Sequence, residues 1–305
     1  MKKIFYISAC LFALALSGCD KSQVKQLGDY ATGVQLKFFH AAPGTPGLDA
    51  YVNGVQVTPT QSVSVTDNLL PGAILTGYVY TGNFPGSNYM IANSGSTAIK
   101  VVASTPIPAL VSAQTAAPGT VITNVTQTTA DGEAYSIITS GLPGSAIAPI
   151  TSFITKDVFP ASVAGNTYVR LAQMIPNAIS AVDITASYIP TGTTTAVVTT
   201  PIVAGVYGSY SGFVALPINP LLTTTYTFQA YLTGTTTKLG ASAAVALTVG
   251  RNYTLVLKGL AADYAVPGTS IILRATARPA AVTDPTRLYP EIYFNAPGLT
   301  YYTNK

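Results

Sequence analysis

The stretch that decides the fold is residues 36–54, which read LKFFHAAPGTPGLDAYVNG. Apolar and polar residues alternate on both sides of a loop that contains Pro43, which is the period-two signature of β-strands. Asn53 and Gly54 predict a type I′ hairpin turn, because both central positions of that turn need a positive φ. The stretch therefore predicts two strands joined by a loop, with a third strand directly after the turn.

Short runs of β-branched and aromatic residues, bounded by Gly, Pro and Asn, continue along the chain at Val55–Val57, Val63–Val65, Tyr78–Tyr80, Ile99–Val102 and Tyr135–Ile138. No apolar stripe at helical spacing interrupts them. Strands with regular turns and no helices indicate β-sandwiches. We predict an all-β chain of antiparallel sandwiches.

The pattern occurs twice. Residues 132–142 match residues 250–260 in spacing and character, and residues 36–43 match residues 169–176. An apolar-Asp pair follows each of the earlier segments, with its carboxylate at Asp49 or Asp183. Two copies are too few for a solenoid, so each copy needs its own core. We predict tandem sandwich domains at residues 33–160 and 161–305, joined near Ala161–Asn166, with the segment 285–305 either completing the second domain or starting a truncated third repeat.

Residues 36–54 resemble the opening of the bacterial domain of unknown function 4397, which typically reads apolar-Arg-apolar-apolar-His-Ala-Ser-Pro and then Val-Asp-Val-Tyr-Val-Asn-Gly. Lys37 and Ala42 depart from that pattern, and the second copy departs further, with Gln173 in place of the histidine. The resemblance implies an immunoglobulin-like β domain in exported proteins, often lipoproteins of the Bacteroidetes type. It implies no activity, cofactor or ligand.

The first eighteen residues have the pattern of a secretion signal, with Lys2 and Lys3 ahead of a short apolar run. The residues that follow the run, Leu16-Ser17-Gly18-Cys19, resemble the lipobox of bacterial lipoproteins. The resemblance implies cleavage between Gly18 and Cys19 and acylation of the Cys19 sulfur. Two or three acyl chains hold a protein firmly on a membrane. We therefore expect a signal peptide at 1–18, and a lipidated terminus with a polar tether at 19–32 that reaches on the order of 20 Å.

Composition excludes several kinds of function. Charged residues make up 9% of the chain, and the formal charge falls from +4 to +2 when Lys2 and Lys3 leave with the signal, so we expect no nucleic-acid partner. Cys10 also leaves, and an acylated Cys19 offers no thiol for a disulfide, a metal or nucleophilic catalysis. A single histidine excludes zinc sites built on two or more histidines. We expect no cofactor, no metal and no enzyme activity.

The remaining polar candidates favour structural roles. His40 lies where a strand meets the Pro43 turn, and we expect its imidazole to bond loop backbone rather than to act as a ligand or base. Asp49 and Asp183 follow loops, where carboxylates usually accept N–H bonds from turns. The nineteen tyrosines suit strands, although aromatic faces also stack on sugars.

We therefore predict a non-catalytic, lipid-anchored protein of the cell envelope that serves as a structural, adhesive or accessory binding module, with an envelope protein as one class of partner. The alternative is a glycan-binding lipoprotein associated with polysaccharide uptake. The most favoured location is the outer membrane, facing either the periplasm or the cell surface. The loops Ala42–Leu48 and Pro176–Ala181 are the expected partner contacts.

Overall fold

The computed structural model describes residues 32–67, 70–105, 116–178, 180–190, 192–199, 202–219, 224–276, 292–293 and 296–305. The predicted signal peptide, the lipidation site at Gly18 and Cys19 and the tether up to residue 31 lie outside the described residues. Within the described part of the chain no helix is long and apolar enough to cross a membrane.

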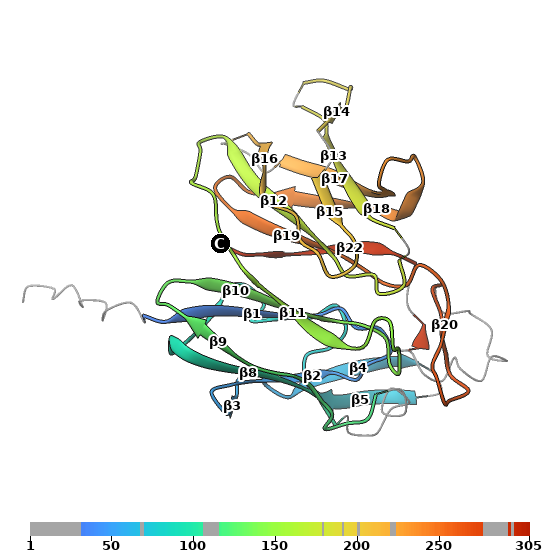
Figure 1. Ribbon diagram of the computed structural model, residues 1–305. Helices are drawn as coiled ribbons and strands as arrows, with labels where there is room; N and C mark the ends of the chain where they lie inside the picture. Colours follow the sequence, from blue (N-terminus) through green and yellow to red (C-terminus); the bar gives the residue numbers. More distant parts are fainter. Residues whose placement is uncertain are drawn as a thin grey trace, which may run out of the picture. The chain divides into compact units, whose positions relative to one another are not determined.

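The chain forms two successive β-sandwiches whose strand pairs are mostly antiparallel, so the predicted all-β sandwich class is confirmed (Figure 1). The first sandwich contains β1 (Val34–His40), β2 (Leu48–Val52), β3 (Val55–Gln56), β6 (Asn83–Phe84), β7 (Met90–Ala92), β8 (Gly95–Ala103), β9 (Val121–Thr129), β10 (Ala134–Ser140) and β11 (Thr151–Lys156). The second contains β12 (Asn166–Gln173), β13 (Val182–Tyr188), β14 (Val197–Val198), β15 (Ile202–Gly205), β16 (Val214–Pro217), β17 (Thr224–Leu232), β18 (Lys238–Leu247), β19 (Asn252–Lys258) and β22 (Gly298–Thr303).

Additional short hairpins accompany the sandwiches: β4 (Gln61–Asp67) pairs with β5 (Leu70–Thr76), and β20 (Tyr264–Ala265) pairs with β21 (Ile272–Leu273). Tyr78–Tyr80, which the sequence predicts as strand, contributes only an isolated bridge between Tyr78 and Leu48. Its backbone leaves the sheet there to form the turn that precedes β6.

The two sandwiches repeat one strand order. The first has a sheet ordered β11-β10-β1-β6 and a sheet ordered β3-β2-β8-β9; the second has β22-β19-β12-β16 and β14-β13-β17-β18. We call the sheets that contain β1 and β12 the inner sheets, and those that contain β2 and β13 the outer sheets. Because β22 pairs with β19 as β11 pairs with β10, the C-terminal strand completes the second sandwich. The alternative of a third repeat is not needed to explain it.

The centre of each inner sheet is a parallel pair, which strand alternation does not predict. β1 runs parallel to β10, and β12 runs parallel to β19. Every position of β10 is buried, and all of β12 after its first residue is buried. Strands that are buried on both faces are typical of parallel pairing. Both faces of each inner sheet must therefore be covered.

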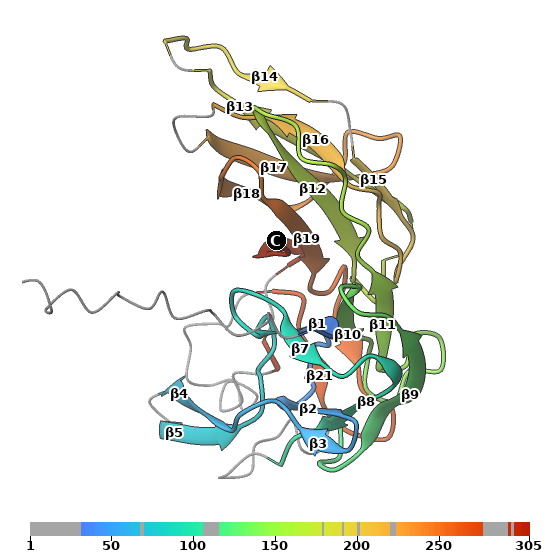
Figure 2. The same ribbon diagram turned by 90° about the vertical axis from the view of Figure 1, so that its left-hand side faces the viewer.

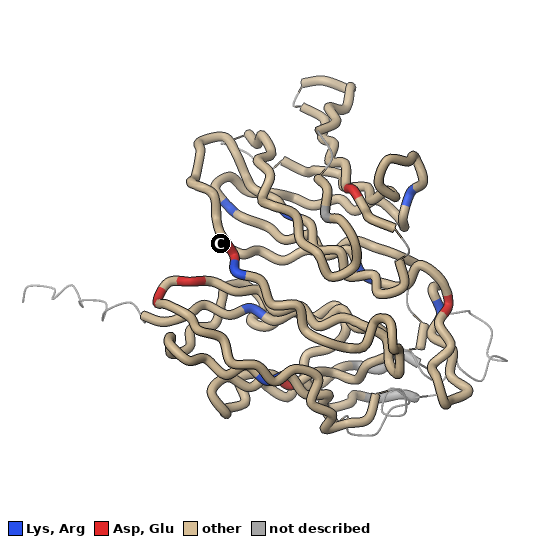
Figure 3. The backbone as a smooth tube through the Cα atoms, viewed as in Figure 1, with Lys and Arg blue, Asp and Glu red and all other residues tan. Residues whose placement is uncertain are grey.

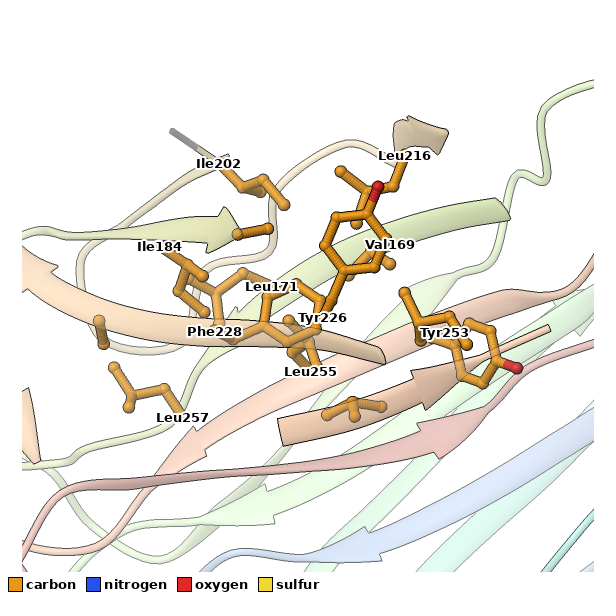
Figure 4. Close-up of a cluster of buried hydrophobic side chains, with 14 of the residues drawn as sticks. Val169, Leu171, Ile184, Ile202, Leu216, Tyr226, Phe228, Tyr253, Leu255 and Leu257 are labelled. Carbon is orange, nitrogen blue, oxygen red and sulfur yellow. The ribbon is translucent and has the colours of Figure 1, made fainter. Parts of the chain in front are cut away.

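Three layers of apolar packing supply that cover. One core lies between the sheets of the first sandwich, and another lies between the sheets of the second, where Leu171, Tyr226 and Phe228 interdigitate (Figure 4). A further cluster joins the inner sheets to each other through Phe39, Ala41, Ile138, Ala172, Met174, Val256 and Tyr302. The sheets are consequently stacked as outer, inner, inner, outer (Figures 1 and 2).

The hairpin of β20 and β21 belongs in sequence to the second copy but packs on the first. Leu273 and Leu260 share an apolar cluster with Leu142 and Tyr80, and the Tyr264 hydroxyl donates to the Pro143 carbonyl oxygen at 3.1 Å. Residues 41–48 are all buried. The expectation that Ala42–Leu48 is an exposed partner loop is therefore wrong, because a segment more than two hundred residues later in the chain covers that end of the sandwich.

Candidate functional site

His40 is fully buried, and the main chain uses both of its ring nitrogens. Nδ1 accepts the N–H of Ala42 at 3.2 Å, so Nε2 carries the proton and donates to the carbonyl oxygen of Pro46 at 3.1 Å. Burial lowers the pKa of His40 to about 4, despite the opposing hydrogen bonds to Pro46 and Thr45. The ring is neutral at physiological pH and braces the loop from inside.

Gln173 makes the first of these two contacts in the second copy, while its Nε2 is buried without a hydrogen-bond partner. Its Oε1 accepts the N–H of Ile175 at 2.7 Å, two residues further on, as His40 does with Ala42. Pro43 follows the first of these caps, in the turn that Gly44 completes with a φ of +71°. The matching geometry in both copies gives His40 the role of a loop brace.

Asp49 and Asp183, which occupy equivalent positions in the two copies, have partners that the sequence did not predict. Asp49 Oδ1 accepts a hydrogen bond from Gln56 Nε2 at 3.4 Å, and Asp183 Oδ1 accepts one from the Thr233 hydroxyl at 2.9 Å. Both donors are side chains on or beside neighbouring strands. The expectation that turn N–H groups donate to these carboxylates is therefore wrong. Burial raises the pKa of Asp49, while a hydrogen bond from Ser104 opposes the rise.

The Asn53-Gly54 turn has the φ values that a type I′ turn requires, +51° at Asn53 and +82° at Gly54. It joins β2 to β3, with Val52 opposite Val55. The Asn53 side chain also accepts the N–H of Ala98 on β8 at 2.9 Å. The turn thus ties three strands of the first outer sheet together.

A buried ring of hydrogen-bonded side chains lies between the inner sheets. Arg170 donates to Asp157 and to the Thr254 hydroxyl (2.9 Å); Thr254 donates to Asn304 (2.7 Å). Asn304 donates to the Tyr89 hydroxyl (2.7 Å), and Tyr89 donates to Asp157 (2.5 Å), which closes the ring. We call these five residues the inter-sandwich ring.

The ring contains a buried ion pair that a further side chain braces. The side chains of Arg170 and Asp157 are 4% and 0% exposed, and Ser136 bridges them by accepting from Arg170 and donating to Asp157. Burial and the Asp157 carboxylate raise the pKa of Tyr89 far above its ordinary value, so Tyr89 remains a donor at every physiological pH. A buried ion pair with its remaining hydrogen bonds satisfied is the arrangement that tolerates desolvation.

Four of the five ring residues lie at positions that correspond between the two copies. Lys37 and Arg170 occupy the same place in β1 and β12, as do Ser136 and Thr254 in β10 and β19, and Asp157 and Asn304 follow β11 and β22. The Lys37 amine lies on the Tyr302 ring (5.5 Å to the centroid) and donates to the Ser87 carbonyl oxygen at 2.8 Å. Burial lowers the pKa of Lys37 to about 8, against the opposing field of Asp157.

Sequence reasoning missed these residues, although a signal for them exists. Lys37 and Arg170 are single charges inside apolar strands, at the same position of both repeats. A charge that recurs at a strand centre indicates a second buried surface on the far face of the sheet. Figure 3 shows how few other charged residues the chain carries over its sheets.

The first outer sheet carries a polar row on the face that points away from the core. Tyr51 stands opposite Gln56 on one side and Lys100 on the other, and Lys100 stands opposite Asn124. The Lys100 amine lies 4.3 Å from the centroid of the Tyr51 ring, and the Tyr51 hydroxyl donates to Gln56 at 3.3 Å. We call Gln56, Tyr51, Lys100 and Asn124 the outer row.

Many of the described tyrosines are buried or pack against a core cluster, the latter being Tyr80, Tyr188, Tyr210, Tyr264 and Tyr293. Tyr78, Tyr135, Tyr168, Tyr226, Tyr253 and Tyr302 are buried, and among the tyrosines that the structure describes only Tyr301 is highly exposed, at 45%. Tyr51 is half-buried. The tyrosine content is therefore explained mainly by packing, as the residue's preference for strands predicts. Among the described residues, no group of three or more His, Cys, Asp and Glu side chains is placed to hold a metal ion.

Neither a protein-family model nor a curated protein matches the chain. Among solved structures it is similar to a family 26 carbohydrate-binding module of Eubacterium rectale Amy13K in complex with maltoheptaose, at 11% identity over 80% of this chain and 97% of that one, with a TM-score of 0.22. Proposed cell adhesion proteins from Bacteroides fragilis (8% identity, 81% and 100% coverage) and Bacteroides ovatus (9%, 81% and 97%) each have a TM-score of 0.19. Likeness at this level supports no conclusion about function.

Proposed function

We propose that this chain is a lipid-anchored, non-catalytic protein of the bacterial cell envelope, related to the domain of unknown function 4397. It holds a rigid pair of sandwiches at the outer membrane as a structural or adhesive module. Cys19, acylated after cleavage behind Gly18, is its anchor.

The proposal that the protein is non-catalytic rests on the structural contacts of the side chains that are chemically most reactive. His40 is a neutral loop brace, and Arg170 and Asp157 are paired in the inter-sandwich ring. Each of these groups is buried, so a substrate does not reach it. Their positions support a stabilising role and a rigid connection between the sandwiches.

Mass spectrometry of the membrane-extracted protein tests the anchor. We expect an N-terminal peptide that begins at Cys19 and carries acyl chains, and a Cys19→Ala variant that no longer fractionates with membranes. An unacylated N-terminus, or a Cys19→Ala variant that stays on the membrane, contradicts the proposal. Protease treatment of intact cells then separates a surface-facing from a periplasm-facing protein, with cleavage at the exposed β10–β11 loop as the readout.

The outer row favours a second candidate function, glycan binding. Tyr51 offers a ring held by Lys100, and Gln56, Asn124 and Lys100 offer hydrogen-bonding groups on the same face of the sheet. Sugars bind where an aromatic face lies among such polar groups.

A glycan array tests this function. Saturable binding that Tyr51→Ala abolishes and Tyr301→Ala leaves intact supports it. Tyr301 is the matched control, since it is exposed but lies on β22 of the second sandwich. Binding that survives Tyr51→Ala contradicts a role for the outer row.

A further inference from the structure

The end of the first sandwich at which β1 starts is the end at which the chain emerges from the predicted tether. The N–H of Gly132 donates to the Gly33 carbonyl oxygen at 2.9 Å, and Ile91 packs beside Gly33. Lys156 lies opposite Tyr135 at the start of β10, so the residues after β11 emerge at the same end. We call this the entry end.

The connector between the sandwiches, residues 158–165, starts at the entry end and is unusually apolar for an exposed segment. It reads VFPASVAG and contains no charge. Val158 is 72% exposed and Val163 is 52% exposed, and Ile91 nearby is 48% exposed. Connecting segments are usually rich in polar and turn residues, whereas this uncharged segment exposes two aliphatic side chains whose removal from water would be favourable.

The connector is also held in place. The Tyr168 hydroxyl donates to the Ala161 carbonyl oxygen at 2.8 Å, and Phe159 packs its ring against Phe213 at 5.7 Å between centroids. The Lys305 amine lies over the Phe159 ring, 5.9 Å from its centroid. Val158 and Val163 therefore point into solvent from a segment that is held in place, while Phe159 packs against the second sandwich.

We infer that the entry end lies on the bilayer, with Val158 and Val163 of the connector seated in the interfacial region of the lipid. This rests on the proposed acylation of Cys19. A tether from Cys19 to Thr32 reaches on the order of 20 Å, so lipidation keeps the entry end close to the membrane surface. Transfer of aliphatic side chains at that surface from water into lipid lowers the free energy.

Charge plays a secondary part in this contact. The ionised groups near the entry end carry both signs, with Lys156 paired to Glu133 and with Asp131 accepting from Ser94. A contact that depends on apolar side chains is insensitive to salt, whereas attraction to anionic lipid weakens as ionic strength rises. We call the contact of Val158 and Val163 with lipid the bilayer seat. It is expected on neutral phosphatidylcholine and in high salt.

The opposite end of the same hairpin supplies a matched control. Ile147 lies in the loop between β10 and β11 and is 97% exposed. It is as aliphatic as Val158, but the length of β10, about 20 Å at roughly 3.3 Å per residue, separates the two. A lipid contact specific to the entry end must distinguish them.

The experiment uses the full lipidated protein in phosphatidylcholine vesicles. Single substitutions Val158→Cys, Val163→Cys and Ile147→Cys are labelled with a nitrobenzoxadiazole fluorophore, since the acylated mature chain offers no other thiol. Vesicles are prepared with and without brominated acyl chains, which quench the fluorophore on contact. We expect quenching at positions 158 and 163 that is several times the quenching at 147, that persists in high salt, and that Val163→Asp reduces for the label at 158 while Ile147→Asp does not.

The outcomes separate the inference from the proposed function. Flotation of the protein with vesicles is measured first, and failure to float overturns the anchor and the bilayer seat together. Flotation with equal quenching at 158 and 147 overturns the bilayer seat and leaves the anchor standing. A blue-shifted but unquenched label at 158 shows that a second copy or another protein covers the connector, which also overturns it.

Discussion

Acidification tests the role of His40 as a neutral loop brace. Lowering the pH from 7 to 4.5 protonates histidine in the unfolded chain, whereas the folded protein resists protonation because the ring is buried and Nδ1 already accepts the Ala42 N–H. The pKa of His40 in the fold is about 4, below its ordinary value of 6.5. The stabilisation is therefore complete above pH 6.5 and is lost as the pH falls towards 4.

The magnitude follows from these two pKa values. Each pKa unit corresponds to about 1.4 kcal/mol, so the full effect is on the order of 3 kcal/mol, and most of it, about 2.5 kcal/mol, is lost between pH 7 and pH 4.5. His40 is fully buried, so solvent screening does not reduce the effect. A loss of this size is a substantial part of the stability of an ordinary domain.

Substitution of His40 by glutamine isolates the contribution of histidine protonation to the free energy of unfolding. Gln173 braces the second copy without titrating, so His40→Gln retains an acceptor for the Ala42 N–H and removes the proton-binding group. Denaturant titrations of the non-lipidated protein and its His40→Gln variant are compared at pH 7 and 4.5. The carboxylates titrate alike in both, so the protein with His40 should lose about 2.5 kcal/mol more than the variant. Equal losses in the two proteins would refute the buried neutral histidine.

Three further predictions concern stability. Arg170→Ala or Asp157→Ala alone should cost about 3–5 kcal/mol, because each leaves a buried charge unpaired, and the double variant should cost much less than the sum; additive losses in a double-mutant cycle would contradict the ion pair. Gly54→Ala should cost about 1 kcal/mol, since φ is +82° with open space around it, whereas Gly86→Ala, equally open but without a positive φ, should change the denaturation midpoint little; equal effects would exclude a backbone cause. Phe228→Ala should cost about 3–5 kcal/mol because the ring is fully buried, and a loss well below that in thermal unfolding would show that this core collapses around the cavity.

Strand pattern and turn chemistry were sufficient for much of the fold. The alternation from Leu48 to Val52 places Leu48, Ala50 and Val52 in the core, as the structure does. Asn53-Gly54 adopts the positive φ values expected of it. The duplication read from the two Gly-bounded tyrosine segments corresponds to β10 and β19, which occupy equivalent places in the two inner sheets. These features are local, since each depends on residues a few positions apart.

The partners of the singled-out side chains were harder to predict. His40 meets loop backbone within six residues, so its environment followed from its neighbours. Asp49 and Asp183 instead meet side chains on or beside paired strands, and such partners depend on register. The tyrosines were divided between core and surface by sheet packing, which leaves Tyr51 half-buried beside Lys100 and Tyr226 inside the second core.

The amino-acid sequence by itself determined an all-β chain, its duplication and its tight turn, because period, spacing and turn residues act over short distances; the lipid-bearing start stays a prediction. The tertiary structure alone decided that the inner sheets face each other, that Arg170 and Asp157 meet between them, and that β20 and β21 cover the loop after His40. A residue's pattern shows that it will be buried, but the surface that buries it comes from distant segments whose approach depends on the whole packed chain.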